Sequence, residues 1–338
     1  MTSRSPDRIL VTGGAGFIGS NFVHHWSRHY PTDRLVVLDA LTYAGNRANL
    51  VDLEAQSNFR FVKGNICDRA LVDSLLQDEN IQMVAHLAAE SHVDRSIVEP
   101  DAFIQTNLVG TFTLLEAFRQ HWQQQQNETM LFLHVSTDEV YGDLGEDDPA
   151  FSEATAYAPN SPYSASKAGS DHLVRAYHHT YRLPTIVTHC SNNYGEYQFP
   201  EKLIPLICVN ILRGKPLPIY GDGQNIRDWL YVGDHCRALD LLSHAGRSGE
   251  TYTIGGDSQI RNIDLVLMIC DLMDELAPSL PIRPSRELIT FVADRPGHDR
   301  RYAINAAKLK TELGWLPQES IATGLRKTLT WYLHHFEP

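Results

Sequence analysis

The sequence predicts an α/β fold in which a doubly wound parallel sheet is joined to a smaller, interleaved C-terminal lobe. Apolar strands alternate with helices over the first half of the chain, the pattern of a parallel sheet covered on both faces. A glycine-rich turn joins the first strand to the first helix. In the second half the alternation gives way to shorter segments rich in Pro and Gly, which suit a separate small lobe.

The length, charge and cysteine content restrict the class of protein. A chain of 338 residues that is 43% hydrophobic can form one large or two closely joined domains. A formal charge of −12 argues against general nucleic-acid binding, which needs a basic face. The N-terminus MTSRSPDR lacks the apolar core of a signal peptide, and no run of about eighteen apolar residues occurs, so we expect a cytoplasmic location. The five cysteines show no CxxC spacing, and we expect them to be reduced and mostly buried.

The first unit, RILVTGGAGFIGS, predicts a phosphate-binding turn. An apolar strand at Ile9–Val11 is followed by Gly13, Gly16 and Gly19 and then by an apolar helix start. Gly13 permits a tight turn, Gly16 lets the backbone approach a pyrophosphate, and Gly19 allows close packing of helix on strand. Alone, such glycines also occur in turns of other α/β folds.

The second strand, RLVVLD, makes the nucleotide interpretation more specific. It ends in Asp39, about twenty residues past the last glycine, where a carboxylate is expected on the adenosine ribose. A carboxylate there repels a 2′-phosphate, so NAD is favoured over NADP. We therefore expect a Rossmann-type sheet with NAD at the carboxyl ends of its strands.

The following segments continue the sheet. We expect a strand at 59–66, a helix over roughly 69–79, a strand ending at Ala88–Ala89, and a long helix over 101–125 that is either core or dimer surface. The run LFLHVS predicts a buried strand that ends at Thr137. A helix from the YSASK run to about Arg182 then ends before Pro184, and TIVTHCSNNYG forms a further strand and turn.

Two stretches carry the chemistry. VSTDEVYG places Thr137, Asp138 and Glu139 side by side at a strand end, and YSASK places Tyr163 and Lys167 four residues apart on one helix face. One pocket could thus hold a Tyr/Lys/Thr set beside a pair of carboxylates. The alternatives are a surface tyrosine beside a solvated lysine, and a strand-end turn in which one carboxylate caps backbone amides.

We expect residues 1–190, with a crossing segment at about 218–245, to form the NAD-binding domain. Residues 191–217 and 246–338 would form the second lobe. The sixteen histidines include three adjacent pairs, but adjacent helical residues point in different directions, so we expect no metal site.

Together these motifs resemble the extended short-chain dehydrogenase/reductase superfamily. TGGAGFIG and YxxxK are shared across it, whereas other segments are similar to the sugar-nucleotide 4,6-dehydratases that act on dTDP-glucose. The specific segments are LDALTYAGN, LAAESHVDRSI, STDEVYG, YSASKAGSDHLVRAY, SNNYGEYQFPEKLIPL and DRPGHDRRYAI. The likeness extends over nearly the whole chain, with Ala40 where a Lys is common and Asn65 where an Asp is common.

The resemblance implies two sets of binding residues. Those for NAD are Gly13, Gly16, Phe17, Ile18, Gly19, Asp39, Ala40, Leu41, Thr42, Asn65, Ile66, Leu87, Ala88, Ala89, Glu90, Ser91, Thr106, Tyr163, Lys167 and Asn193. Those for the sugar nucleotide are Ser91, Thr137, Asn192, Lys202, Leu203, Pro218, Ile219, Tyr220, Arg227, Asn262, Asp294, Arg295, Pro296, Gly297 and His298.

The resemblance also implies a reaction, the loss of water from dTDP-glucose to give dTDP-4-keto-6-deoxyglucose for deoxysugar synthesis. Tyr163, helped by Lys167 and Thr137, would take the C4 hydroxyl proton while NAD oxidises C4. Glu139 would take the C5 proton, and Asp138, with a raised pKa, would protonate the departing C6 hydroxyl. NAD is then regenerated and stays tightly bound.

Other interpretations remain open. A 4-epimerase would keep the Tyr/Lys/Thr set without needing Asp138 and Glu139, and a related dehydratase could use UDP, CDP or GDP sugars. A non-catalytic NAD-binding scaffold would not need these residues. Arg227 is the preferred diphosphate ligand, although surface ion pairing is the alternative for each arginine near it. The family further implies a homodimer through the helices at about 101–125 and 163–182.

Overall fold

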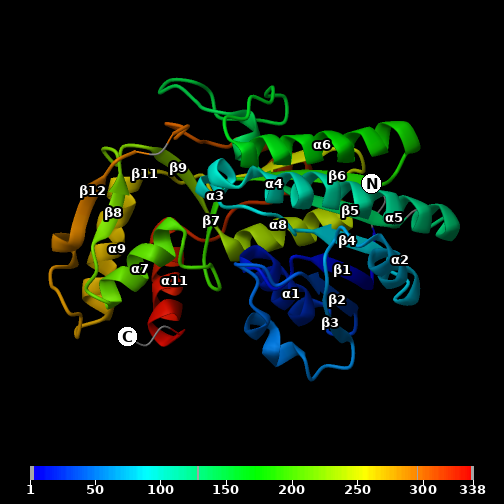
Figure 1. The fold of residues 1–338 in the computed structure, drawn as a ribbon, viewed down its shortest axis with the longest axis horizontal. Coiled ribbons are helices and arrows are strands. Elements are labelled where there is room, and N and C mark those ends of the chain that lie inside the picture. The colour runs from blue at the N-terminus through cyan, green and yellow to red at the C-terminus, as the bar shows by residue number, and fades with distance from the viewer. Residues whose placement is uncertain (1–3, 128, 295, 336–338) are drawn as a thin grey trace.

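The computed structural model describes residues 4–127, 129–294 and 296–335. A large parallel sheet lies at one side of the molecule, and a smaller group of helices and short strands lies beside it (Figure 1). The predicted fold class is confirmed. Seven strands pair in the order β10-β6-β5-β4-β1-β2-β3, all parallel: β1 (Arg8–Thr12), β2 (Arg34–Asp39), β3 (Phe59–Lys63), β4 (Met83–His86), β5 (Leu131–Thr137), β6 (Thr185–Cys190) and β10 (Thr251–Ile254).

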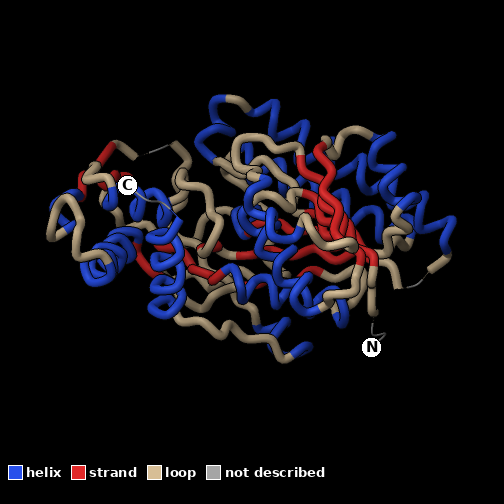
Figure 2. The backbone as a smooth tube through the Cα atoms, turned by 90° about the horizontal axis from the view of Figure 1, so that it is seen from below, coloured by secondary structure: helices blue, strands red, loops and turns tan. Residues whose placement is uncertain are grey.

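Helices cover both faces of this sheet because successive strand residues point in opposite directions (Figure 2). In β1, Ile9 and Val11 pack into one core and Leu10 into the other. The first core is completed by α1 (Phe17–His29), α8 (Val232–Ala245) and α10 (Ala307–Leu313). The second is completed by α2 (Arg69–Asp78), α5 (Thr111–Gln125) and α6 (Pro162–Tyr181).

The smaller part has its own apolar core, which includes Tyr194, Trp229 and Tyr332. One small sheet contains β7 (Asn192–Tyr194), β9 (Ile226–Tyr231) and β11 (Gln259–Arg261), and the other pairs β8 (Leu217–Tyr220) with β12 (Ile289–Val292). Around them lie α7 (Leu203–Leu212), α9 (Asn262–Leu276), η4 (Ser285–Leu288) and α11 (Ile321–His335).

Short helical segments connect the strands of the large sheet near their carboxyl ends. They are η1 (Arg47–Leu53), α3 (Val93–Val98), α4 (Pro100–Phe103), η2 (Ile104–Gly110) and η3 (Asp138–Tyr141).

Two strands end earlier than the sequence predicts. The strand expected to reach residue 66 ends at Lys63, whose partner Asp39 is the last residue of β2. The strand expected to end at Ala88–Ala89 ends at His86, which pairs with Thr12, the last residue of β1 before the turn at Gly13. The chain beyond His86 is thereby released from the ladder and can line a pocket.

The helix predicted over 101–125 is not regular. Its segment Ile104–Gly110 is a π-helix, η2, which lies between α4 and α5. Within it the Asn107 side chain accepts from the Glu90 N–H at 2.9 Å and donates to the Glu90 carbonyl at 3.0 Å. Such π segments are frequent at functional sites, and this one holds the loop after β4 in place.

The domain division stays a prediction, but two strands are placed unexpectedly with respect to it. β10, from the range assigned to the second lobe, is the edge strand of the large sheet, where it pairs with β6. β8, from the crossing segment, pairs with β12 in the smaller part. The crossing segment therefore contributes to both parts, since α8 packs against α1.

All five cysteines are free, and four of them are buried. No helix in the described part of the chain is long and apolar enough to cross a membrane.

Candidate active site

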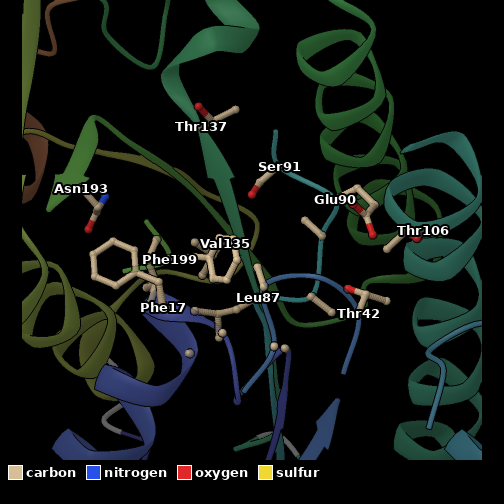
Figure 3. A pocket seen from close by; sticks show the side chains of 18 of the residues that line it. Phe17, Thr42, Leu87, Glu90, Ser91, Thr106, Val135, Thr137, Asn193 and Phe199 are labelled. Atoms are coloured by element: carbon tan, nitrogen blue, oxygen red, sulfur yellow. The ribbon is translucent and has the colours of Figure 1, made fainter. Parts of the chain in front are cut away.

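A pocket opens at the carboxyl ends of β1, β4 and β5, where the strand order reverses. Figure 3 shows Thr137 at the end of β5, with Asn193 and Phe199 on one side and Thr42 and Thr106 on the other. The crevice at such a switch point is where open α/β sheets bind their ligands.

The glycine turn leaves the pocket floor without side chains. Gly13 has a φ of +70°, and a Cβ there would lie 2.6 Å from the Ala88 nitrogen. A Cβ on Gly19 would lie 2.1 Å from the Gly13 carbonyl oxygen, so α1 can approach β1 only with glycine at this position. The N-terminus of α1 has no side-chain cap, and its amides face a cradle suited to a pyrophosphate.

Asp39 is buried at the end of β2. Its carboxylate accepts hydrogen bonds from the backbone N–H of Ala15 at 2.9 Å and of Leu41 at 2.8 Å. Burial raises its pKa, although these two bonds act in the opposite direction. The two bonds fix the orientation of the carboxylate beside the glycine turn. A bare glycine cradle, free helix amides and an oriented acid together fit a dinucleotide without a 2′-phosphate.

The carboxylate pair lies where β5 ends and η3 begins. Thr137 caps η3, since its hydroxyl accepts from the Glu139 N–H at 3.3 Å, and the same hydroxyl lies 3.4 Å from Asp138 Oδ1. Asp138 is 2% exposed, whereas Glu139 is only partly buried. The two adjacent carboxyl groups therefore have different surroundings.

That difference separates their protonation states. Burial raises the pKa of Asp138 well above its ordinary value, and the nearby charges of Glu139 and Asp228 raise it further. The Oδ2 atom of Asp138 is buried and has no hydrogen-bond partner among the described residues. A protonated carboxyl group there could donate this proton to a ligand in the pocket.

Tyr163 and Lys167 lie on the first turns of α6. The helix begins with a capping box in which Ser161 and Ser164 satisfy each other's backbone N–H groups. The buried Lys167 ammonium donates to the Val135 carbonyl of β5 at 2.9 Å. Both side chains line the pocket with Thr137.

The pKa of Tyr163 is raised well above its usual value in the protein alone. Burial is the main cause and the charge of Glu139 the next, while a hydrogen bond with Thr137 acts the other way. The chain therefore holds Tyr163 as a neutral phenol until another positive charge lies near it.

The pocket brings together most of the predicted residues. Those that line it are Gly13, Gly16, Phe17, Ile18, Gly19, Asp39, Ala40, Thr42, Asn65, Ile66, Leu87, Ala88, Ala89, Glu90, Ser91, Thr106, Thr137, Asp138, Glu139, Tyr163, Lys167, Asn192, Asn193 and Lys202. Leu41 is not among them; it has a φ of +52° and serves Asp39 through its backbone N–H.

The remaining predicted substrate residues do not line this pocket and belong chiefly to the smaller part. They are Leu203, Pro218, Ile219, Tyr220, Arg227, Asn262, Asp294, Pro296, Gly297 and His298, while Arg295 is outside the described residues. Several of them are close together: His298 Nδ1 lies 2.6 Å from Asp294, and its ring meets the Tyr220 ring edge-on at 6.0 Å. Tyr220 also reaches Asp94 of α3 at 3.4 Å, which links the two parts.

Arg227, the preferred diphosphate ligand, is 5% exposed. Its guanidinium donates to the carbonyls of Ile226 and Asp299, both at 2.8 Å, and lies over the Tyr302 ring at 4.2 Å. In this arrangement it supports the 299–302 segment, and its contact with a diphosphate stays a prediction.

Sequence reasoning missed several residues of the pocket. They are Leu38, Tyr43, Ala44, Gly45, Gly64, Val135, Ser136, Cys190, Ser191, Gln198, Phe199 and Glu201. Tyr43 and Gly45 follow Asp39 in the LDALTYAGN segment, and Phe199 and Glu201 lie in YQFPEK, so their motifs pointed to the site although single positions were not chosen.

Known proteins match the chain over nearly its whole length. A family model described as GDP-mannose 4,6 dehydratase matches residues 10–328. The chain is 58% identical over 331 residues to a dTDP-glucose 4,6-dehydratase of Neisseria meningitidis serogroup B, a match that covers 96% of this chain and 93% of that relative.

Solved structures also match the chain over nearly its whole length. DesIV, a dTDP-glucose 4,6-dehydratase of Streptomyces venezuelae with NAD and dTDP bound, matches with a TM-score of 0.89 and 46% identity over 97% of each chain. A UDP-glucose 4-epimerase of Thermotoga maritima matches with a TM-score of 0.85 but only 28% identity, over 97% of this chain and 99% of that one.

Proposed function

Because the chain belongs to the family described as GDP-mannose 4,6 dehydratase, within the extended short-chain dehydrogenases/reductases, we propose that it is a dTDP-glucose 4,6-dehydratase. It converts dTDP-glucose to dTDP-4-keto-6-deoxyglucose and water with retained NAD, and so supplies deoxysugar synthesis. The observation that carries this proposal is the buried Asp138 beside the partly buried Glu139, in one pocket with Tyr163 and Lys167.

The chain's residues fit each proton transfer. Bound NAD would take a hydride from C4 of the sugar and later return it at C6. Tyr163, anchored on the capped end of α6, takes the proton of the C4 hydroxyl, and Thr137 hydrogen-bonds at the same place. The Lys167 ammonium, held by Val135, supplies the positive charge that favours an ionised phenol.

The carboxyl groups then remove water. A ketone at C4 makes the C5 hydrogen acidic, and Glu139 takes it as a base. Asp138, kept protonated by burial, gives its proton to the departing C6 hydroxyl, which leaves as water. Glu139 returns its proton to C5 when C6 is reduced. Over one turnover Tyr163 gains a proton and Asp138 loses one, so a proton must pass between these two groups or through solvent before the next cycle.

In this arrangement the two parts of the molecule bind different groups. NAD occupies the glycine cradle of the predicted domain 1–190, while the dTDP group of the substrate reaches residues of the smaller part such as Tyr220 and His298. Their link to α3 through Tyr220 and Asp94 supports this placement. Preference for dTDP over other nucleotides rests on the 58% identical relative and on the dTDP complex of DesIV.

A 4-epimerase is the second candidate, since such enzymes share the fold at 28% identity. The Asp138–Glu139 pair disfavours it, because exchange of hydride on the two faces of C4 needs no acid and base at C5 and C6.

The test is turnover of dTDP-glucose by the purified protein, with the product identified by mass and by the absorbance of 4-keto sugars in alkali. We expect the product made by the unmodified protein to be lighter than dTDP-glucose by one water. Asp138→Asn and Glu139→Gln should each slow water loss by about 100-fold or more while C4 oxidation, followed as reduced nicotinamide, still occurs. The matched control is Glu146→Gln with Asp147→Asn, an adjacent carboxylate pair that is fully on the surface. A C4 epimer without loss of water, or full activity of both site variants, would overturn the proposal.

A further inference from the structure

A buried polar cluster lies behind the active-site strand, and of its members only Ser136 also lines the pocket described above. It is centred on Asp171, which is 2% exposed and points from α6 toward β5 and β6. A second cavity, of about 400 Å³, borders this cluster and is lined by Tyr141, Glu153, Thr155, Ala156, Tyr157, Asp171, His172, Arg175, Val187, His189 and Thr251. None of these residues is used by the chemistry proposed above.

Four side chains surround the Asp171 carboxylate. The Ser136 hydroxyl donates to Oδ2 at 3.0 Å, and His189 Nε2 lies 3.0 Å from the same oxygen. His134 Nε2 lies 3.1 Å from Oδ1, and the Tyr157 hydroxyl reaches Oδ2 at 3.3 Å. The orientation of His189 is fixed from its other side, where Nδ1 lies 2.6 Å from the Tyr141 hydroxyl.

This cluster lies one helical turn from the catalytic lysine. Asp171 follows Lys167 by one helical turn, so the two side chains lie on the same face of α6. They also meet successive residues of β5, since Lys167 binds the carbonyl of Val135 and Asp171 the hydroxyl of Ser136. Both are at least nine-tenths buried, where opposite charges are weakly screened.

The shifts in pKa have the directions that such a pair requires. Burial lowers the pKa of Lys167, and the negative charge of Asp171 is the main effect that opposes this lowering. Burial would raise the pKa of Asp171, but the nearby His134 and His189 side chains outweigh it and hold the pKa below its usual value. Without Asp171 the ammonium would be buried with only the Val135 carbonyl to stabilise it among the described residues.

We propose that Asp171 is a positioning residue that keeps the Lys167 ammonium charged and held against Val135, while His134 and His189 hold the Asp171 carboxylate in place. This inference rests on the proposed function, in which the charge on Lys167 favours ionisation of Tyr163. It assigns to the second half of the YSASKAGSD segment a role in catalysis that acts only through Lys167.

Three other groups near the ammonium do not change charge in the working range. His86 faces it from β4, His134 from β5 and Cys190 from β6. Burial lowers the pKa of His134 to about 4 and that of His86 well below its usual value, and burial raises the pKa of Cys190 to about 12. Between about pH 6 and about pH 10 His86, His134 and Cys190 stay uncharged. Of these four groups, only Asp171 then carries a negative charge that can compensate the ammonium.

The decisive experiment is an NMR titration of the lysine amines in the NAD-loaded protein without substrate. Lys167 is assigned by comparison with Lys167→Met. We expect Asp171→Asn to lower the pKa of Lys167 by about one unit or more. Asp234→Asn is the matched control, because Asp234 is also 2% exposed but binds Arg237 and the chain at 318–319 instead. It should leave Lys167 unchanged.

A Lys167 pKa that is equal in the parent and in Asp171→Asn would overturn the inference. If Asp171→Asn does not fold, the pKa of Lys167 in the unmodified protein decides the question. A Lys167 side chain that loses its proton near neutral pH would show that no adjacent negative charge keeps it protonated, and would overturn the inference. Because this measurement needs no turnover, it stands or fails separately from the proposed reaction.

Kinetics provide the second readout. In Asp171→Asn the Lys167 ammonium should lose its proton at a lower pH. The alkaline limb of the kcat–pH profile should therefore move to lower pH by as much as the pKa of Lys167 falls, and Asp171→Glu should move the limb most of the way back. A residue that only stabilised the fold would reduce kcat equally at every pH and leave the limb in place.

Discussion

Asp138 is a single residue whose burial raises the pKa of its carboxyl group and so suits it to act as an acid. Its carboxyl group is adjacent to Glu139 in sequence, yet only Asp138 is almost fully buried, and its Oδ2 atom has no partner among the described residues. Keeping this proton favours the folded state only at low pH. A buried acid suited to protonate a leaving group therefore lowers the free energy of unfolding at neutral pH.

We predict that Asp138→Asn makes the protein more stable than the parent as pH rises. Because the folded pKa is raised, the folded state keeps a proton that the unfolded state releases above about pH 4, so each further pH unit costs the parent about 1.4 kcal/mol until the folded pKa is reached. Asparagine does not titrate. Urea unfolding at several values between about pH 5 and about pH 7 should show the gap in unfolding free energy widening with pH.

The exposed Asp147→Asn serves as its control and should follow the parent at every pH. Parallel stability curves for Asp138→Asn and the parent would show that Asp138 is already ionised in the folded protein.

How far single residues could be predicted depended on whether local sequence determines their surroundings. Thr137, Tyr163 and Lys167 were identified because a strand end and a helix spacing define where they point. The raised pKa of Tyr163 was not predicted, because it depends on burial and on Glu139, which only the folded chain brings near. Arg227 likewise carries no local signal for its contacts with the 299–302 segment.

At the scale of elements, α6 is the helix on which the site depends most. Its first turn carries Tyr163 and its second Lys167, and the third reaches Asp171. The start of the helix is fixed by the reciprocal hydrogen bonds of Ser161 and Ser164. Any fraying of this end would move the phenol before it affected the rest of the fold.

We predict that Ser161→Ala lowers the free energy of unfolding by about 1 kcal/mol and also reduces kcat. The loss of the cap loosens the turn that carries Tyr163. Ser320→Ala is the matched control, since Ser320 caps α11 through the Thr323 N–H at 3.2 Å and neither residue lines the pocket. Thermal unfolding and turnover of both variants check this.

Ser320→Ala should lose similar stability while kcat is kept. An equal fall of kcat in the two variants would mean that overall stability, rather than the start of α6, controls activity.

Elements were predicted well where a strand or helix is defined by its own residues. The apolar run of β5 and the caps of α6 are local, and both elements appear as expected. The ends of β3 and β4 were not predicted, because a strand's own residues do not show where its pairing with a neighbouring strand stops. The π segment η2 was also missed, since the bonds of Asn107 to Glu90 join residues seventeen positions apart.

At the scale of the molecule, we propose a homodimer through the helices at about 101–125 and 163–182. Supporting this, Ile104, Val109 and Phe112 are 46%, 37% and 48% exposed on η2 and α5, and Tyr181 at the end of α6 is 43% exposed. Large apolar side chains gathered on adjacent helices favour contact with a second copy.

We predict that Phe112→Lys shifts the protein from dimer to monomer, because a charge would be buried in the shared face. Size-exclusion chromatography with light scattering measures this. Leu316→Lys is the control, as Leu316 is 51% exposed near α10 and should leave the mass unchanged. A parent that elutes as a monomer would refute the dimer itself.

The pairing of β10 with β6 has a consequence for how the protein is made. Residues 251–254 complete a sheet whose other six strands are all translated by residue 190, so a nascent chain leaving the ribosome carries β6 as an open edge until some sixty further residues have emerged. During that interval β6 can pair with a strand of another chain. Slow translation between these two points should therefore increase the demand for chaperones.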